Sequence, residues 1–339
     1  MVLKKSDRDY NYITASRNYK TYRWYKPLLT GVLTLVLFYV FVSIISAIVS
    51  MQLMWANLEP SEYVIVDYDS LDAYSVAGAF LSIGSMAVML PALFIAVLIV
   101  RDRPFSSYSS SRGGWNNRSF GRSIIVASII CGVQFIFMLV NNGGIKSGDI
   151  LFDRTGFVVL TLLLPFQCIA EEYFFRGFVM QTFGAWFRKP VIAILLQAVI
   201  FTAVHPYNSY GMMAIFACAV IYGTVVYKTH GLEATCAIHI LTNYTAFCAS
   251  GLGIDKITSD VDITSMIVTI AMDSLFAFFV IRLGSKFGWF KTGRKKKPLI
   301  QINRIVPGKY HRKKLQMSNY ESNGNYNISR LCNVKDYLH

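Results

Sequence analysis

The sequence predicts an all-α, polytopic membrane helix bundle with eight transmembrane helices and both termini in the cytoplasm. Its 339 residues are 54% hydrophobic and 15% charged, whereas about a quarter of the residues of a soluble domain are charged. Apolar runs long enough to cross a bilayer recur along the chain. The basic residues, which give a net charge of +14, gather in the terminal segments and in alternate loops.

Each predicted span is an apolar run bounded by polar or charged residues. The eight runs cover residues 28–54, 74–100, 123–140, 156–186, 190–207, 210–228, 232–250 and 263–284. The fourth span exceeds the roughly 20 residues that cross the hydrocarbon core, so we expect its last turns to project into the cytoplasm. Pro91 in the second span and Pro165 in the fourth lack a backbone N–H, which predicts a kink in both helices.

The distribution of Lys and Arg among the loops predicts the orientation. The leader and the second loop are strongly basic, and the later turns at Arg188, Lys189 and Lys228 carry positive charge as well. The intervening loops are acidic or nearly neutral, and the first of them has five carboxylates and no Lys or Arg. Because basic loops stay in the cytoplasm, an even number of spans places both termini there.

These features divide the chain into five regions. They are a basic cytoplasmic leader (1–27), N-terminal transmembrane helices (28–140), a core with the candidate site (156–251), the last transmembrane helix (263–284) and a basic, partly disordered cytoplasmic tail (291–339). We expect the tail to be a solvated segment attracted to anionic headgroups, or a regulatory membrane-binding segment. We expect no nucleic-acid partner, because no recognised binding module accompanies the charge. The predicted location is the cell membrane, as a multi-pass protein.

Two adjacent glutamates, Glu171 and Glu172, lie in an otherwise apolar span and are followed by Arg176. A charged side chain at the centre of a membrane helix costs about 2.5–3.5 kcal/mol, so three ionisable groups within six residues indicate a common function. Glu172 and Arg176 have the i,i+4 spacing of an ion pair, which could be purely structural. Glu171 is the surplus carboxylate, and in a low dielectric it requires a proton, a metal or a nearby histidine.

Two histidines in later spans could meet that requirement. His205 lies near the outer end of the fifth span, and His239 lies in the seventh span with Asn243 on the same helix face. Such a group supports the attack of water on a carbonyl, with the carboxylate as general base and the histidine and amide as oxyanion donors. Glu171, His205 and His239 would equally suit a divalent metal such as zinc, so metal dependence stays open.

The remaining intramembrane acids and the cysteines carry less information. Glu233 begins a predicted helix, where its charge complements the helix dipole. Asp273 in the last span is expected to pair with a polar neighbour or to face a wet gap. The six cysteines show no CxxC pair and no ligand-like spacing, which indicates neither a disulfide framework nor a cysteine–zinc site.

Three short motifs on three spans resemble, in order and spacing, those of the CPBP intramembrane proteases. This family includes CAAX prenyl endopeptidases and bacteriocin-immunity proteins. The motifs are Glu171-Glu172-x-x-x-Arg176, Phe201-x-x-x-His205 and His239-x-x-x-Asn243. The resemblance covers residues 156–248, implies an all-helical membrane core with a cytoplasm-facing cavity, and makes region 156–251 a CPBP-like catalytic core.

The resemblance also implies a role for each motif residue. These roles are water activation by Glu171 with His205, support of that pair by Glu172, anchoring of the glutamate helix by Arg176, and an oxyanion site formed by His239 and Asn243. Members of the family are described both as metalloproteases and as metal-free, glutamate-dependent proteases, and the residues suit either.

The sequence therefore predicts an intramembrane endopeptidase that cleaves a membrane-associated or lipidated protein or peptide. Two alternatives from other classes remain. One is a non-catalytic membrane scaffold or bacteriocin-immunity factor with the same fold. The other is a proton-coupled transporter, because intramembrane acids and histidines also form proton relays.

Overall fold

The computed structural model describes residues 11–55, 74–145, 150–152 and 154–290. The chain divides into two units, Met1–Lys291 and Thr292–His339, and the described residues all belong to the first. Predictions about the first ten residues, the acidic loop 56–73 and the tail lie outside the described residues. Within the described part the structure is helical, with one isolated β-bridge and no strand. The prediction of an all-helical protein is thereby confirmed.

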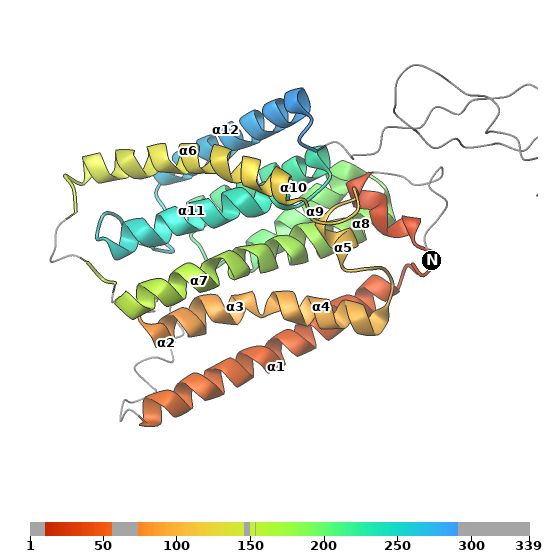
Figure 1. The fold of residues 1–339 in the computed structure, drawn as a ribbon, viewed down its shortest axis with the longest axis horizontal. Coiled ribbons are helices and arrows are strands. Elements are labelled where there is room, and N and C mark those ends of the chain that lie inside the picture. The colour runs from red at the N-terminus through yellow and green to blue at the C-terminus, as the bar shows by residue number, and fades with distance from the viewer. Residues whose placement is uncertain (1–10, 56–73, 146–149, 153, 291–339) are drawn as a thin grey trace, which may run out of the picture. The chain divides into compact units, whose positions relative to one another are not determined.

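The elements follow one another in a simple order along the chain (Figure 1). They are η2 (Tyr12–Asn18), α1 (Lys26–Trp55), α2 (Val76–Ala79), η5 (Phe80–Gly84), α3 (Ser85–Ala87), α4 (Met89–Val100), α5 (Ser106–Ser109), α6 (Asn117–Asn141), α7 (Arg154–Glu171), η7 (Glu172–Val179), α8 (Met180–Phe187), α9 (Pro190–Ala203), α10 (Ser209–Thr229), α11 (Glu233–Gly251) and α12 (Ile263–Phe287).

Six helical segments of the described chain are long and apolar enough to cross a membrane, as in a multi-pass membrane protein. These are Lys26–Trp55, Val76–Val100, Asn117–Asn141, Arg154–Phe187, Ser209–Thr229 and Ile263–Phe287. The other two predicted spans are helical, but each lacks either the length or the apolar composition of a membrane-crossing helix. Helix α9 has only 14 residues, and α11 carries several polar side chains, among them Glu233, His239 and Asn243. The count of eight transmembrane helices therefore stays a prediction.

The two spans predicted to kink at an internal proline are both irregular. In the second span the π-helical η5 and a turn at Val88 come shortly before Pro91. In the fourth span Pro165 lies inside α7, and the π-helical η7 begins seven residues later. A π-helical turn is rare and occurs frequently at functional sites. Glu171 and Glu172 are the last residue of α7 and the first of η7, so they lie at the junction itself.

The loops gather at two opposite ends of the helices (Figure 1). At one end, Lys26 Nζ donates to Arg101 O at 3.4 Å, and Ser111 N donates to His230 O at 3.1 Å. At the other end, Leu151 N donates to Gly251 O at 2.9 Å. The first end therefore collects loops predicted to be cytoplasmic, which are rich in Lys and Arg.

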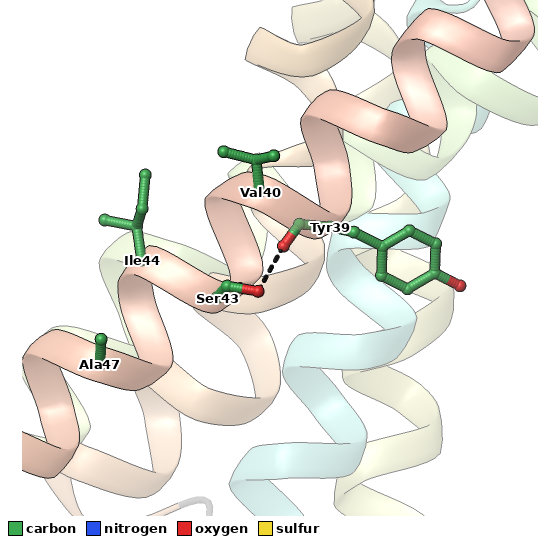
Figure 2. Close-up of a pocket in the computed structure, with 5 residues that line it drawn as sticks. All are labelled: Tyr39, Val40, Ser43, Ile44 and Ala47. Atoms are coloured by element: carbon green, nitrogen blue, oxygen red, sulfur yellow. Dashed lines mark hydrogen bonds between the residues drawn. The ribbon is translucent and has the colours of Figure 1, made fainter.

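Helix α1 lies at one edge of the helical arrangement and exposes most of its apolar side chains (Figure 1). Its outer face has a shallow hollow of about 430 Å³, and all of the lining comes from this one helix (Figure 2). The lining residues are Tyr39, Val40, Ser43, Ile44 and Ala47. The Ser43 hydroxyl donates to Tyr39 O at 2.8 Å, so this polar group is satisfied within the helix. Such a face suits contact with lipid tails.

The segment after the glutamates is held by the chain that precedes α1 and by the loop before α5. The Tyr12 hydroxyl in η2 donates to Tyr108 O at 2.6 Å. Arg17 donates to Ala185 O in α8 at 2.8 Å. The buried Arg103 donates to Gln181 Oε1 at 2.5 Å. These contacts fix α8 in place and, through it, the π-helical turn that carries the site.

Candidate active site

The glutamate pair occupies two different environments. Glu172 is fully buried, and its Oε1 lies 3.1 Å from Arg176 Nη1, so the structure forms the i,i+4 ion pair that the spacing predicts. Glu171 keeps 8% of its surface exposed. The two carboxylates point to different neighbours because consecutive helical residues are turned by about 100°. Glu172 is therefore locked into the helix, while Glu171 retains access from outside the protein.

His239 lies between the two glutamates. Its Nδ1 is 3.0 Å from Glu172 Oε1, and its Nε2 is 3.7 Å from Glu171 Oε2. A carboxylate paired with arginine can only accept a hydrogen bond, so Nδ1 is the protonated nitrogen in this contact. Because the hydrogen bond at one ring nitrogen sets the state of the other, Nε2 is the nitrogen that faces Glu171 and can take or give a proton.

Gln167 connects Glu171 to Asn243. Gln167 Nε2 donates to Glu171 Oε1 at 2.5 Å, and Asn243 Nδ2 donates to Gln167 Oε1 at 3.4 Å. The Cys168 thiol also donates to Gln167 Oε1, at 3.2 Å. Sequence reasoning missed Gln167, although it precedes Glu171 by four residues and therefore lies on the same helix face. This side chain orients one oxygen of Glu171 and leaves the other toward His239.

Arg176 is fully buried and lies against aromatic rings. Its guanidinium carbon is 4.2 Å from the centre of the Phe201 ring and 5.5 Å from that of Tyr222. The Tyr222 hydroxyl donates to Asp273 Oδ1 at 3.0 Å. Asp273 in α12 therefore pairs with a polar neighbour, which was one of its two expected states. The cation–π contacts and the ion pair with Glu172 hold the guanidinium in the bundle.

His205 lies just beyond the end of α9, which stops at Ala203. Its Nδ1 is 2.6 Å from Phe201 O, and its ring centre is 4.5 Å from that of Phe201. Among the described residues it makes no hydrogen bond or ion pair with Glu171. The His205 ring contacts the Phe201 ring, and the Phe201 ring in turn packs against Arg176. The histidine that the structure places beside Glu171 is His239, so assistance from His205 stays a prediction.

Glu233 has a fuller explanation than the helix dipole. Its Oε2 lies 2.5 Å from Arg112 Nη2, and its Oε1 accepts from Asn116 N at 3.0 Å. The side chain is fully buried at the start of α11. The pairing with Arg112, 121 residues earlier, could not be foreseen from local spacing. It ties the loop before α6 to the helix that carries His239.

The predicted metal ligands do not come together. In the part of the chain that the structure describes, no group of three His, Cys, Asp or Glu side chains could hold a metal ion. Glu171 and His239 are neighbours, whereas the hydrogen bonds of His205 end at the backbone near its own helix. The donor set of these three residues therefore does not fit a zinc ion, and no chemical step is derived through one.

The arrangement places a slightly exposed carboxylate beside an oriented histidine, with an amide nearby. Residues 153–245 match the family model of the type II CAAX prenyl endopeptidases, Rce1-like. This Rce1-like segment contains all six predicted site residues, and the resemblance predicted from the motifs is confirmed over it. The chain is also 30% identical over 122 residues to the uncharacterized protein YyaK of Bacillus subtilis (strain 168).

The match to YyaK covers 34% of this chain and 40% of that protein's length. No solved structure matches the chain significantly. The family-model match, at residues 153–245, spans the helices that carry the glutamates and the histidines.

Proposed function

We propose that this protein is an intramembrane endopeptidase that hydrolyses a peptide bond of a membrane-associated or lipidated protein or peptide. The observation that carries the proposal is the buried cluster of Glu171, His239, Glu172 and Arg176 within the Rce1-like segment. A multi-pass membrane protein with a purely structural ion pair would need Glu172 and Arg176 alone. A structural ion pair does not require Glu171 or its position next to His239, and the proposed chemistry uses both.

We place the attacking water beside Glu171 and His239. The distance of 3.7 Å between Glu171 Oε2 and His239 Nε2 is too long for a direct hydrogen bond, and a water molecule to one side of the two atoms would contact both. Glu171 Oε1 already accepts from Gln167, so Oε2 is the oxygen available to accept a proton from water. Glu171 is thus positioned as a general base.

The reaction then follows from these positions. Glu171 accepts a proton as the water oxygen forms a bond to the carbonyl carbon, which gives a tetrahedral intermediate with an oxyanion. Asn243 and His239 are the proposed donors to that oxyanion. When the C–N bond breaks, the proton held by Glu171 passes to the leaving amine nitrogen. Glu172 and Arg176 act indirectly, by holding the His239 ring in position.

The proposed topology has eight passages through the membrane with both termini in the cytoplasm. Helices α9 and α11 connect loops at the same two ends as the six longer spans (Figure 1), which supports counting them as passages. The end that gathers the basic loops would face the cytoplasm and attract anionic headgroups. Reporter fusions at the C-terminus and in the loop before α12 test this. Both fusions reporting the same side of the membrane would contradict it.

Cleavage by the purified protein tests the proposed activity. The wild-type protein in lipid vesicles should cut a membrane-tethered reporter peptide, and mass spectrometry should show water added across one peptide bond. Glu171→Gln keeps the size and the hydrogen-bond partners of the side chain but removes the base, so cleavage should fall by about 10²- to 10⁴-fold. Cleavage that survives this substitution would contradict the role of Glu171.

Two further measurements separate the alternatives, a cellular phenotype and substrate flux. A scaffold or immunity factor would keep its cellular phenotype in both Glu171→Gln and His205→Ala. A proton-coupled transporter would show substrate flux that depends on a pH gradient, without any cleavage. Each of these results would overturn the protease proposal.

A further inference from the structure

A cavity outside the candidate site lies between α6, the start of α7, and α11, which are neighbours in the bundle (Figure 1). Its volume is about 610 Å³, within the range of about 300–1,000 Å³ that is typical of ligand sites. The interior is largely apolar, with Phe135, Phe157 and Tyr244 among its walls. It lies at the end of the helices that is opposite the basic loops, close to the Leu151–Gly251 hydrogen bond.

A single cation stands in the lining of this cavity. Arg154 begins α7 and has an exposed side chain. Among the described residues, no carboxylate forms an ion pair with it. The N-terminus of α7 adds the partial positive charge of a helix dipole at the same place. The cavity therefore combines an apolar interior with one cationic side chain at its rim.

The wall of the cavity continues into a lipid-facing surface. On α6, Gly132 and Phe135 line the cavity, while Ile129, Val133 and Ile136 on the outer face are each more than 60% exposed. In a membrane protein such an apolar face contacts acyl chains. A lipid in contact with this face therefore lies next to the cavity and has no water layer to cross.

We infer that the cavity binds a phospholipid of the surrounding bilayer, with one acyl chain inside and the phosphate at Arg154. The charge of Arg154 complements the phosphate, and the apolar walls complement the chain. An uncharged apolar ligand would leave the cation without a partner, and a small soluble anion would leave the apolar walls without contacts. This lipid site is independent of the proposed protease activity.

Photolabelling of the full-length protein tests the lipid site. The probe is phosphatidylglycerol with a diazirine at the end of one acyl chain, added to phosphatidylcholine vesicles that contain the protein. After irradiation, mass spectrometry should place the label on the stretches of α6 and α11 that line the cavity. Excess unlabelled phosphatidylglycerol should remove this label.

Two pairs of variants show whether the label reports the cavity. A Cβ at Gly132 or at Gly121 meets no atom within 4 Å, so leucine is tolerated at both, but only Gly132 lines the cavity. Gly132→Leu should lower labelling of the cavity about tenfold, and Gly121→Leu should leave it unchanged. Arg154→Gln should lower it about fivefold, whereas Lys256→Gln, at an exposed site outside the cavity lining, should not.

Three results would overturn the lipid site. One is equal labelling of the cavity in Gly132→Leu and Gly121→Leu. A second is a label spread evenly over the lipid-facing surfaces of α1 and α12. The third is labelling by a photoactivatable fatty acid but not by the phosphatidylglycerol probe, which would make a single-chain anion the occupant. Thermal unfolding of each variant confirms that a lost label does not reflect a lost fold.

Discussion

Two buried glutamates, Glu233 in α11 and Glu171 beside it, show how a structural ion pair differs from the proposed active site. Glu233 is fully buried, and both of its oxygens are occupied, one by Arg112 and one by the Asn116 backbone N–H. Glu171 is slightly exposed, and among the described residues its one close donor is Gln167, at Oε1. Its Oε2 faces His239 Nε2 at 3.7 Å, which is longer than a direct hydrogen bond.

The difference shows that burial and charge alone do not identify a functional carboxylate. Each oxygen of the fully buried Glu233 has a close donor, so its contribution is to hold two segments together. Glu171 has one oxygen that faces a histidine whose other nitrogen is held by Glu172, and it is accessible from outside the protein. An accessible oxygen without a close donor among the described residues is thus what separates the two.

The largest expected effect comes from removing Arg176, the cation of the candidate active site. Arg176→Met leaves Glu172 buried without its charge partner, which should lower the free energy of unfolding by about 3–5 kcal/mol. Arg118→Met, at an exposed position on α6, is the matched control and should change it by less than about 0.5 kcal/mol. Reversible unfolding in mixed detergent micelles measures both. Equal stabilities would mean that Arg176 does not stabilise the cluster.

The next effect concerns catalysis rather than stability. Asn243→Ala removes a proposed oxyanion donor and should lower kcat about 10²- to 10³-fold. The free energy of unfolding should change little, because the Asn243 contact to Gln167 is long, at 3.4 Å. Steady-state kinetics on the reporter peptide measure this change. A rise in KM with unchanged kcat would instead assign Asn243 to substrate binding.

Glu233→Gln should lower stability and leave cleavage unchanged, the opposite of Asn243→Ala. It replaces a charge-assisted contact with Arg112 by a neutral one, so the free energy of unfolding should fall by about 1.5–3 kcal/mol. Cleavage per folded molecule should stay close to that of the wild-type protein. Full stability combined with lost cleavage would show that Glu233 is not merely structural.

The smallest effect is expected at Tyr222. Tyr222→Phe removes the hydrogen bond to Asp273 but keeps the ring that packs near Arg176. The expected loss of stability is about 1 kcal/mol. Tyr222→Leu removes the ring as well and is expected to cost more, because a large aromatic contributes packing and cation–π contacts. Similar losses in both variants would mean that the ring contributes little.

Much of the fold follows from local properties of the sequence. Apolar runs predict the helices, and Pro165 predicts an irregular fourth span, although a π-helical turn at Glu172–Val179 has no signal of its own. The number of transmembrane helices is harder to predict, because α9 has only 14 residues and α11 carries polar residues of the candidate site. Polar side chains lower the mean hydropathy of a helix, so a helix that carries a candidate site is harder to recognise as a membrane span.

Of the contacts in the candidate site, the sequence predicts one ion pair but not the others. The spacing of Glu172 and Arg176 predicts their ion pair directly. Which histidine approaches Glu171 depends on how α9 and α11 pack, and the structure places His239 there rather than His205. Gln167 and Arg112 were missed because an amide in a span and an arginine in a loop show no chemistry until the fold supplies their partners.

The most direct test of the account is cleavage per folded molecule in Glu171→Gln and Glu233→Gln, measured side by side on the same membrane-tethered peptide. Both variants replace a buried glutamate by its isosteric amide. The account predicts a loss of about 10²- to 10⁴-fold for Glu171→Gln and wild-type cleavage for Glu233→Gln. Equal cleavage in the two variants would contradict the assignment of the reactive carboxylate to Glu171.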